Sequence, residues 1–127
     1  MPITKTDTLP SSATQLNLPN DTGAKTFIAF VSSKDPVTGL PWCPDVRAAL
    51  PFINAAFESD SAPSLAVVEV GQKEVWRHPQ NEYRVNWNVT AIPALVRYER
   101  VNGHVSETGR LVEGQILDKD GLAKFIS

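Results

Sequence analysis

Two continuous apolar runs, with a segment of helical periodicity between them, dominate the hydrophobic pattern of the chain. Residues 26–31 and 65–70 are rich in β-branched and other apolar residues, as expected of strands that are covered on both faces of a sheet. Between the two runs, apolar residues recur at the spacing of a helix, at Val46, Ala49, Leu50, Ile53, Ala56 and Phe57. The order of strand, helix and strand predicts a βαβ unit with parallel strands and a right-handed crossover.

The second half of the chain predicts one more helix, a β-hairpin and a closing helix. A helix is expected to open at residues 78–80, and Trp76, Tyr83 and Trp87 are the expected packing face of this middle segment. Residues 94–101 alternate between apolar and charged side chains. The Asn102-Gly103 turn then leads into a second extended stretch that ends at residue 111, which predicts a hairpin. Residues 118–127 combine acidic caps with apolar residues at helical spacing and so predict a helix.

The first 24 residues are polar and rich in turn-forming residues. Ser11-Ser12 is a candidate cap for a short helix, and residues 19–23 predict a turn. The predicted order of elements is therefore βαβ, then α, then ββα. The N-terminal segment before them is expected to be ordered only where it packs against the rest of the domain.

Composition limits the number of domains and the class of partner. The chain has 127 residues, 42% of them hydrophobic, which suits a single domain spanning residues 1–127. Its net charge of −2 and its scattered basic residues argue against a nucleic-acid partner. The first residues do not resemble a signal peptide, and no apolar stretch approaches the roughly 18 residues of a membrane span. We therefore expect a cytoplasmic protein that does not insert into a membrane.

The single cysteine excludes a disulfide within the chain, and with two distant histidines it offers too few ligands for a structural zinc site. We expect no metal and no bound cofactor. The interest of Cys43 lies instead in its position, because the strand over residues 26–31 leads through a loop to a helix that starts beside it. Reactive groups of open α/β sheets gather at this edge.

A thiol at a helix N-terminus faces unpaired N–H groups and the positive end of the helix dipole, and both favour the thiolate. Cys43 is therefore a candidate nucleophile. Pro44 suits the first helical position, Trp42 offers an apolar collar beside the sulfur, and Asp45 favours the helix start while opposing the thiolate. The alternative is that Cys43 is a small buried hydrophobe, as lone cysteines often are. Its place at a loop-to-helix junction, with Pro41-Trp42 before it and Pro44-Asp45 after it, favours the functional interpretation.

Several segments together resemble the thioredoxin domain-containing protein 17 family of small cytosolic thioredoxin-related proteins. The resemblance covers residues 25–101 well and the two ends loosely. It rests on Ser33-Lys34-Asp35, Trp42-Cys43-Pro44-Asp45, Pro51, Gly71-Gln72-Lys73, Trp76, Pro79-Gln80-Asn81, Arg84 and Thr90-Ala91-Ile92-Pro93-Ala94-Leu95. It implies an α/β thioredoxin fold, with a mixed sheet of four to five strands flanked by helices on both faces. It also implies a cis Ile92-Pro93 bond facing Cys43.

The activity implied by the resemblance is reduction of small or exposed disulfides, sustained by thioredoxin reductase. The family centre is Trp-Cys-Pro-Asp-Cys, but Val46 stands here at the second cysteine. That second thiol normally releases the substrate from its mixed disulfide with the first. Ala29 also stands where ordinary thioredoxins carry a buried aspartate. Two parts of the dithiol machinery are therefore missing together.

The resulting hypothesis is a monothiol oxidoreductase in which Cys43 attacks a disulfide and an outside thiol such as glutathione releases the product. Trp42, Pro44, Asp45 and Val46 would surround the thiol, and Ile92 and Pro93 would align the substrate. The glutathione-binding Gly-Gly-x-x-Asp signature of glutaredoxins does not follow Pro93, which argues against tight glutathione specificity.

Two alternatives stay open. One is a redox-inactive or redox-regulated binding module that recognises an extended peptide beside Pro93. The other is a dimer linked by a disulfide through Cys43.

Overall fold

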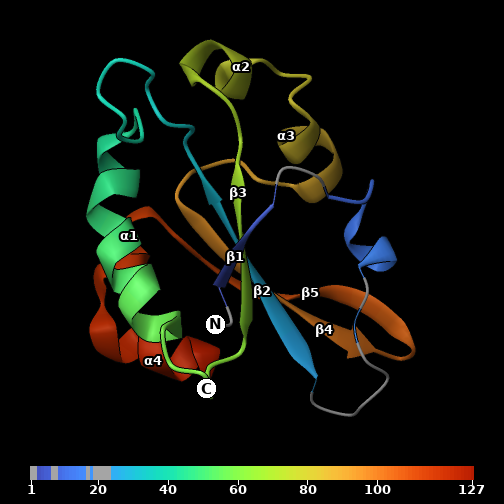
Figure 1. The fold of residues 1–127 in the computed structure, drawn as a ribbon. Helices are drawn as coiled ribbons and strands as arrows, with labels where there is room; N and C mark the ends of the chain where they lie inside the picture. The colour runs from blue at the N-terminus through green and yellow to red at the C-terminus, as the bar shows by residue number, and fades with distance from the viewer. Residues whose placement is uncertain (1–2, 7–8, 17, 19–23) are drawn as a thin grey trace.

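A five-stranded mixed sheet forms the centre of the computed structural model, which describes residues 3–6, 9–16, 18 and 24–127 (Figure 1). Its strands are β1 (Ile3–Lys5), β2 (Lys25–Val31), β3 (Ser64–Glu69), β4 (Ala94–Val101) and β5 (His104–Val112). They lie in the order β1-β3-β2-β4-β5, with β1 and β2 parallel to β3, and with β4 antiparallel to both β2 and β5. The expected parallel βαβ unit and the hairpin are therefore both present.

The helices cover both faces of this sheet, as predicted. They are α1 (Pro44–Phe57), α2 (Lys73–Arg77), α3 (Glu82–Trp87) and α4 (Lys119–Ile126), with two 3₁₀ turns, η1 (Ala13–Gln15) and η2 (Glu113–Leu117). On one face, the ring of Phe27 meets Phe57 of α1 at 5.3 Å and Phe125 of α4 at 5.6 Å, measured between centroids. On the other, Phe30 packs on Tyr83 and Trp87 of α3. No helix in the described part of the chain is long and apolar enough to cross a membrane.

The middle segment differs from the prediction, because it forms two short helices instead of one that opens at residue 78. His78 ends α2 in an extended conformation, as expected of a residue that precedes proline. Asn81 then caps α3, and its side chain accepts a hydrogen bond from the Tyr83 N–H at 2.9 Å. Trp76, Tyr83 and Trp87 are buried, as expected.

The N-terminal segment contains a strand that the sequence pattern did not reveal. β1 is only three residues long and pairs with the edge of β3, with Ile3 opposite Leu65. Ser12 precedes the short helix η1, as predicted, although its side chain makes no capping hydrogen bond. The turn expected over residues 19–23 lies outside the described residues.

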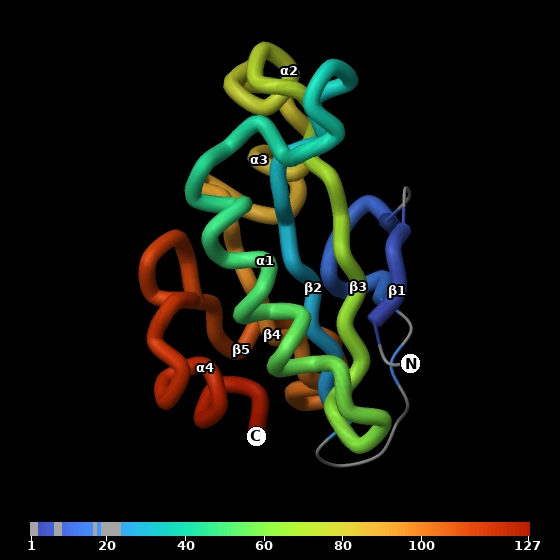
Figure 2. The backbone as a smooth tube through the Cα atoms, turned by 60° about the vertical axis from the view of Figure 1, so that its left-hand side comes forward, coloured from blue at the N-terminus to red at the C-terminus, as the bar shows by residue number. Residues whose placement is uncertain are grey.

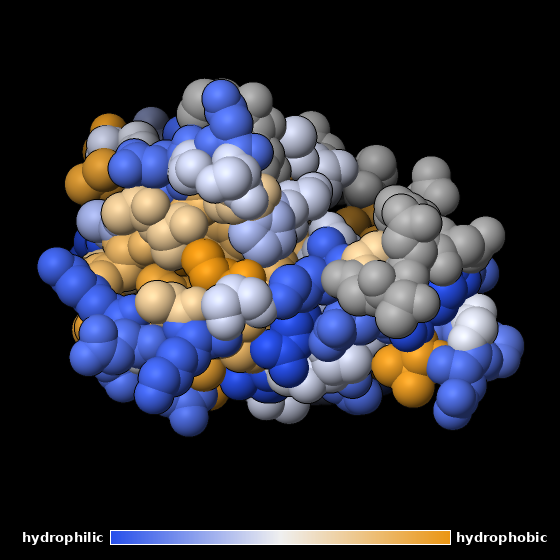
Figure 3. All heavy atoms as spheres, turned by 90° about the horizontal axis from the view of Figure 1, so that it is seen from below, coloured by the Kyte–Doolittle hydropathy of each residue, from blue (hydrophilic) through white to orange (hydrophobic). Residues whose placement is uncertain are grey.

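Helix α4 lies beside the C-terminal part of α1, and the two leave an apolar area on the surface (Figures 2 and 3). A groove between them has a volume of about 390 Å³. Its lining residues are Phe52, Ala55, Ala56, Lys119, Leu122, Ala123 and Ile126. Because Phe52 lies nine residues after Cys43 in the sequence, more than two helical turns separate the groove from the start of α1.

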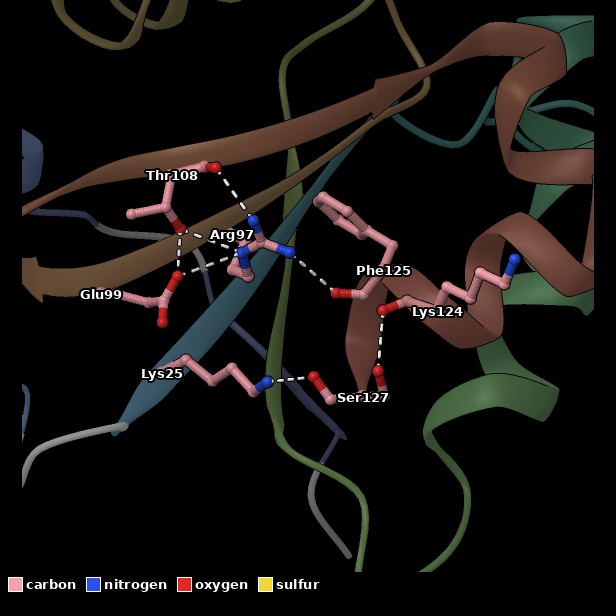
Figure 4. Close-up of polar contacts among 7 residues, drawn as sticks. All are labelled: Lys25, Arg97, Glu99, Thr108, Lys124, Phe125 and Ser127. Atoms are coloured by element: carbon pink, nitrogen blue, oxygen red, sulfur yellow. Dashed lines mark hydrogen bonds and ion pairs between the residues drawn. The ribbon is translucent and has the colours of Figure 1, made fainter.

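Helix α4 is fastened to the sheet by Arg97 of β4 (Figure 4). The Arg97 guanidinium donates to the Phe125 carbonyl at 3.0 Å, near the C-terminal end of α4, and lies over the Phe125 ring. It also donates to the Thr108 carbonyl at 2.9 Å and to the Thr108 hydroxyl at 2.9 Å, and that hydroxyl donates to Glu99. A register shift between Arg97 and Tyr98 places Thr108 at a β-bulge, where it can meet Arg97.

We expect Arg97→Ala to lower the free energy of unfolding by about 2 kcal/mol, because it removes three hydrogen bonds, one of them from a charged donor to a carbonyl at the end of α4. Urea denaturation measures this change. Arg77→Ala on the exposed surface of α2 is the matched control and should alter stability by less than about 0.5 kcal/mol. Equal losses in the two variants would show that the Arg97 contacts do not stabilise α4.

Candidate active site

Cys43 lies at the start of α1, as the pattern predicted. It is the N-cap residue, with extended φ and ψ of −86° and 122°, and its carbonyl accepts the Arg47 N–H at 3.1 Å. Pro44 takes the first helical position, where its missing N–H is no loss. The Cys43 side chain is half-buried, and Pro44 and Asp45 are exposed beside it. Cys43 is thus partly exposed at the N-terminal end of α1, although its side chain makes no capping hydrogen bond.

Ser32 holds the main chain of Cys43 in place. Its hydroxyl accepts the Cys43 N–H at 3.2 Å, and the residue is only 1% exposed. Ser32 directly follows β2, so this bond ties the start of α1 to the end of the central strand. Ser32 was not among the residues expected at the site. The sequence signal that could have identified Ser32 is its position as a polar residue directly after a strand of apolar residues.

Gly71, which follows β3, fixes the position of Trp42. The Gly71 carbonyl accepts the indole N–H of Trp42 at 2.9 Å and the Ser33 N–H at 3.3 Å, and the Gly71 N–H donates to the Ser33 hydroxyl at 3.0 Å. Glycine is required here because φ is +113° and a Cβ would lie 2.7 Å from Cγ1 of Val75. The indole of the residue before Cys43 is therefore held by the main chain that follows β3.

The loop between β2 and Trp42 has a defined shape. Lys34 and Pro41 form an isolated antiparallel bridge, and inside it the Asp35 N–H donates to the Leu40 carbonyl at 2.8 Å. Two side chains that do not belong to the loop also bind it. The Arg47 guanidinium donates to the Pro41 carbonyl at 2.6 Å, and the Gln72 amide donates to the Lys34 carbonyl at 2.7 Å. The loop is anchored to both α1 and the residue that precedes α2.

Val46 lies on the buried side of α1, with no exposed surface. Ala29 of β2 is equally buried and pairs with Val67 and Leu95 in the neighbouring strands. Neither Val46 nor Ala29 supplies a thiol or a carboxylate to the chemistry of Cys43. The chemistry available at this helix start therefore comes from one thiol.

Ile92 and Pro93 lie at the same edge of the sheet as Ser32. The residue after them, Ala94, pairs with Phe30 in antiparallel register, so the chain before Ala94 runs beside the end of β2 (Figure 1). The Ile92–Pro93 peptide bond is cis, and both residues are buried. The Pro93 carbonyl accepts the Glu113 N–H at 2.9 Å, whereas the main chain of Ile92 makes no hydrogen bond to any described residue.

The remaining titratable groups of note lie away from Cys43, on β4 and β5. Burial raises the pKa of the Tyr98 phenol well above its usual value, and the nearby Glu107 charge adds to the effect. A hydrogen bond to Glu107 raises the pKa of the Arg110 guanidinium. His104 begins β5 and is exposed, as expected. Within the described ranges, no group of three or more His, Cys, Asp or Glu side chains is arranged to hold a metal ion.

Comparison with solved structures supports the fold. The Trichomonas vaginalis thioredoxin structure aligns with 99% of this chain and 98% of its own, with a TM-score of 0.56 and 13% identity. A crystal structure of Plasmodium falciparum thioredoxin aligns with 80% of this chain and 70% of its own, with a TM-score of 0.53 and 14% identity. These likenesses confirm the predicted α/β thioredoxin fold.

Comparison of sequences identifies closer relatives. A thioredoxin domain-containing protein of Schizosaccharomyces pombe is 42% identical over 100 residues, which are 79% of this chain and 81% of the relative. Thioredoxin domain-containing protein 17 of Homo sapiens is 36% identical over 77 residues, covering 60% of this chain and 62% of the human protein. The thioredoxin-like protein Clot of Arabidopsis thaliana is 34% identical over 96 residues, 72% of each chain.

The predicted resemblance is confirmed at the level of the family. The family model described as "Thioredoxin domain-containing protein 17-like, thioredoxin domain" matches residues 8–127, which include the Cys43 helix start and the Ile92–Pro93 segment. This chain belongs to the thioredoxin domain-containing protein 17-like family.

Proposed function

We propose that this chain is a thiol–disulfide oxidoreductase that acts through Cys43 alone. The observation that carries the proposal is the half-buried thiol at the first turn of α1, with its main chain fixed by Ser32 and with the buried side chain of Val46 where a second thiol would stand. Membership of a thioredoxin-like family supports redox chemistry at this position. The single thiol restricts that chemistry to reactions that an outside thiol completes.

The reaction has two thiol exchanges. In the first, the Cys43 thiolate attacks one sulfur of a disulfide, a Cys43–substrate disulfide forms, and the other substrate sulfur leaves as a thiolate. In the second, an outside thiolate attacks the bound substrate sulfur, and Cys43 leaves as a thiolate. The first exchange reduces one substrate sulfur to a thiolate and places Cys43 in the mixed disulfide, and the second passes that disulfide to the outside thiol. A further outside thiol must then reduce the disulfide between the substrate and the first outside thiol to release the second substrate sulfur, so the outside thiol is the reductant of the cycle.

Glutathione is the proposed outside thiol, and small-molecule or exposed protein disulfides are the proposed substrates. The cytoplasm is the proposed location, because its glutathione pool keeps thiols reduced. Thioredoxin reductase is the alternative reductant. The main chain of Ile92, which is unpaired among the described residues, lies at the same sheet edge as Ser32 and offers an N–H and a carbonyl that would align a substrate beside Cys43.

Incubation with oxidised glutathione tests the proposal directly. We expect the intact mass to rise by one glutathione per chain, and reduced glutathione to restore the free thiol repeatedly. Cys43→Ser should remain unmodified, with a loss of at least about a hundredfold in disulfide exchange rate, because the hydroxyl is a far weaker nucleophile. A chain that forms no adduct would contradict the proposal.

Two other results, from peptide binding and from electrophoresis, would point to different functions. Absence of an adduct together with binding of an extended peptide favours a binding module, an alternative supported by Val46 in place of a resolving cysteine. A band of twice the mass on non-reducing electrophoresis, lost in Cys43→Ser, indicates a dimer linked through Cys43.

A further inference from the structure

The hydroxyl of Tyr98 is the one buried side-chain polar atom that has no hydrogen-bond partner in the part of the chain that the structure describes. Tyr98 lies on β4 and is only 1% exposed. A buried hydroxyl that stays unpaired costs free energy, and folded proteins pair nearly all such groups with protein atoms, water or a ligand. The phenol of Tyr98 therefore lacks a partner that something outside the chain can supply.

Tyr98 lines a pocket between η1, the end of α3 and the β4–β5 hairpin. In Figure 1, η1 is the short blue helix that lies between α3 and the hairpin. The pocket has a volume of about 280 Å³, whereas a single water needs only about 10–15 Å³. Pockets for small organic ligands begin at about 300 Å³. The pocket is therefore large enough for a small organic molecule and too large for one bridging water.

The floor of the pocket is buried and carries two aromatic rings. Trp87, Tyr98 and Val105 line it and are each at most 5% exposed. The ring of Trp87 meets the ring of Tyr98 edge to face, with 5.8 Å between centroids and an angle of 89°. The indole N–H of Trp87 likewise forms no hydrogen bond to a described residue. Two aromatic side chains with an unused polar group thus line the same pocket.

The one charged side chain among the lining residues, Glu107, is already neutralised by the protein. A β-bulge brings Glu107 opposite Tyr98, and both carboxylate oxygens accept a bond from the Arg110 guanidinium at 2.6 Å. Arg110 also donates to the Asn88 carbonyl at 2.8 Å, which ties the hairpin to the end of α3. A cation or an anion in the pocket therefore gains little from this ion pair.

The rim of the pocket offers hydroxyl and amide groups, on Ser12, Thr14, Asn86 and Ser106. Such groups both donate and accept hydrogen bonds. A ligand that is rich in hydroxyls has the same versatility, so it can pair with the rim and with the Tyr98 phenol, while its C–H groups pack on the Trp87 ring. An aliphatic ligand would leave all these polar groups unpaired.

We propose that this pocket binds a small neutral polyol, of about the size of a monosaccharide, and that one ligand hydroxyl pairs with the phenol of Tyr98. The proposal goes beyond the thiol chemistry, because the pocket shares no lining residue with the Cys43 site. It holds or fails independently of the proposed oxidoreductase function.

An NMR titration of the ¹⁵N-labelled chain tests the proposal, with glycerol, myo-inositol and D-glucose as probes. The measurement is the position of the assigned indole N–H signals of the three tryptophans, Trp42, Trp76 and Trp87. We expect at least one polyol to move the Trp87 signal saturably, with a dissociation constant of about 1–10 mM, and to leave the other two in place. Acetate and methylammonium, which are charged probes of opposite sign, should leave the Trp87 signal in place.

Tyr98→Phe keeps the ring and removes only the unpaired hydroxyl, so it should fold and should bind the polyol at least about fivefold more weakly. Tyr83→Phe is the matched control, since Tyr83 does not line the pocket, and its affinity should stay within about twofold. Asn86→Ala, on the exposed rim, should weaken binding at least about threefold.

Three results would overturn the inference. If no polyol moves the Trp87 signal saturably, the pocket holds only solvent water. If acetate or methylammonium binds more tightly than the polyols, the ligand class is wrong. If Tyr98→Phe binds as tightly as the parent chain, the phenol is not a ligand contact.

Discussion

Asn81→Asp is expected to lower the free energy of unfolding by about 4 kcal/mol at pH 7, since it places an unpaired charge inside the fold. Asn81 is 8% exposed, and its amide donates to the carbonyls of Val70 and Val75, both at 3.1 Å. A carboxylate of the same shape would face these two oxygens with no hydrogen to offer. Only the bond from the Tyr83 N–H would remain.

The loss in Asn81→Asp should depend on pH. Burial and two facing carbonyls would hold the pKa of the new carboxyl above its unfolded value of about 3.9. Below pH 3.9 the new carboxyl is protonated in both the folded and the unfolded chain, and its O–H can donate to one of the two carbonyls. The loss in free energy of unfolding is therefore smallest there. The loss grows as the pH rises from the unfolded pKa to the folded pKa and is constant above the folded pKa.

Urea denaturation at several pH values, each compared with the parent chain, measures this profile. Asn54→Asp is the matched control, because Asn54 lies on the exposed side of α1, and its effect should stay within about 0.5 kcal/mol. A deficit of the same size at pH 3.5 and pH 7 would mean that charge burial is not its cause.

Val46→Cys is expected to raise turnover in disulfide reduction at least tenfold at millimolar external thiol. Position 46 lies on the same helix as Cys43, three residues along, so a thiol there would attack the Cys43–substrate disulfide within the molecule. An intramolecular thiol has a far higher effective concentration than millimolar glutathione. Release of the substrate would then no longer depend on the outside thiol, which would only be needed to reduce the disulfide left between Cys43 and the introduced thiol.

Single-turnover release of a labelled peptide from its Cys43 disulfide, followed without added thiol, checks this expectation. Val46→Ala is the matched control, since it also shortens the buried side chain but brings no sulfur, and it should leave the peptide bound. If Val46→Cys also left the peptide bound, the surroundings of Cys43 would no longer support dithiol chemistry.

The sequence was most informative where burial is strongest. The runs containing Phe27, Phe30, Leu65 and Val68 are covered on both faces in the structure, so their apolar pattern was unambiguous. The helix start at Cys43 was also predictable, because Pro44 favours the first helical position and apolar spacing follows it. The Asn102-Gly103 turn is likewise a local signal, with both residues at positive φ.

Elements that depend on distant contacts were not predictable. β1 is short and gains its hydrogen bonds from β3, about 60 residues away, so its own sequence carries no clear strand period. Asn81, between α2 and α3, also donates to the Val70 carbonyl, a contact that the local sequence does not announce. At the candidate site, the bonds from Cys43 to Ser32 and from Trp42 to Gly71 join residues 11 and 29 positions apart in the sequence, and residue spacing alone does not reveal such pairs.

The contacts that shape the loop beside Cys43 have a consequence for its sequence variation. The bonds from Trp42 to Ser33, from Asp35 to Leu40 and from Gly39 to Asp35 all join main-chain atoms. Asp35 and Thr38 also matter for the loop, because their side chains accept the Val37 N–H at 2.8 Å and the Leu40 N–H at 3.2 Å, and Gly39 has a φ of +72°. The side chains of Val37 and Leu40 make none of these bonds and can be exchanged while the backbone that leads into α1 keeps its course. The loop is a suitable place for a combinatorial library, in which new partner preferences are selected on an unaltered thiol.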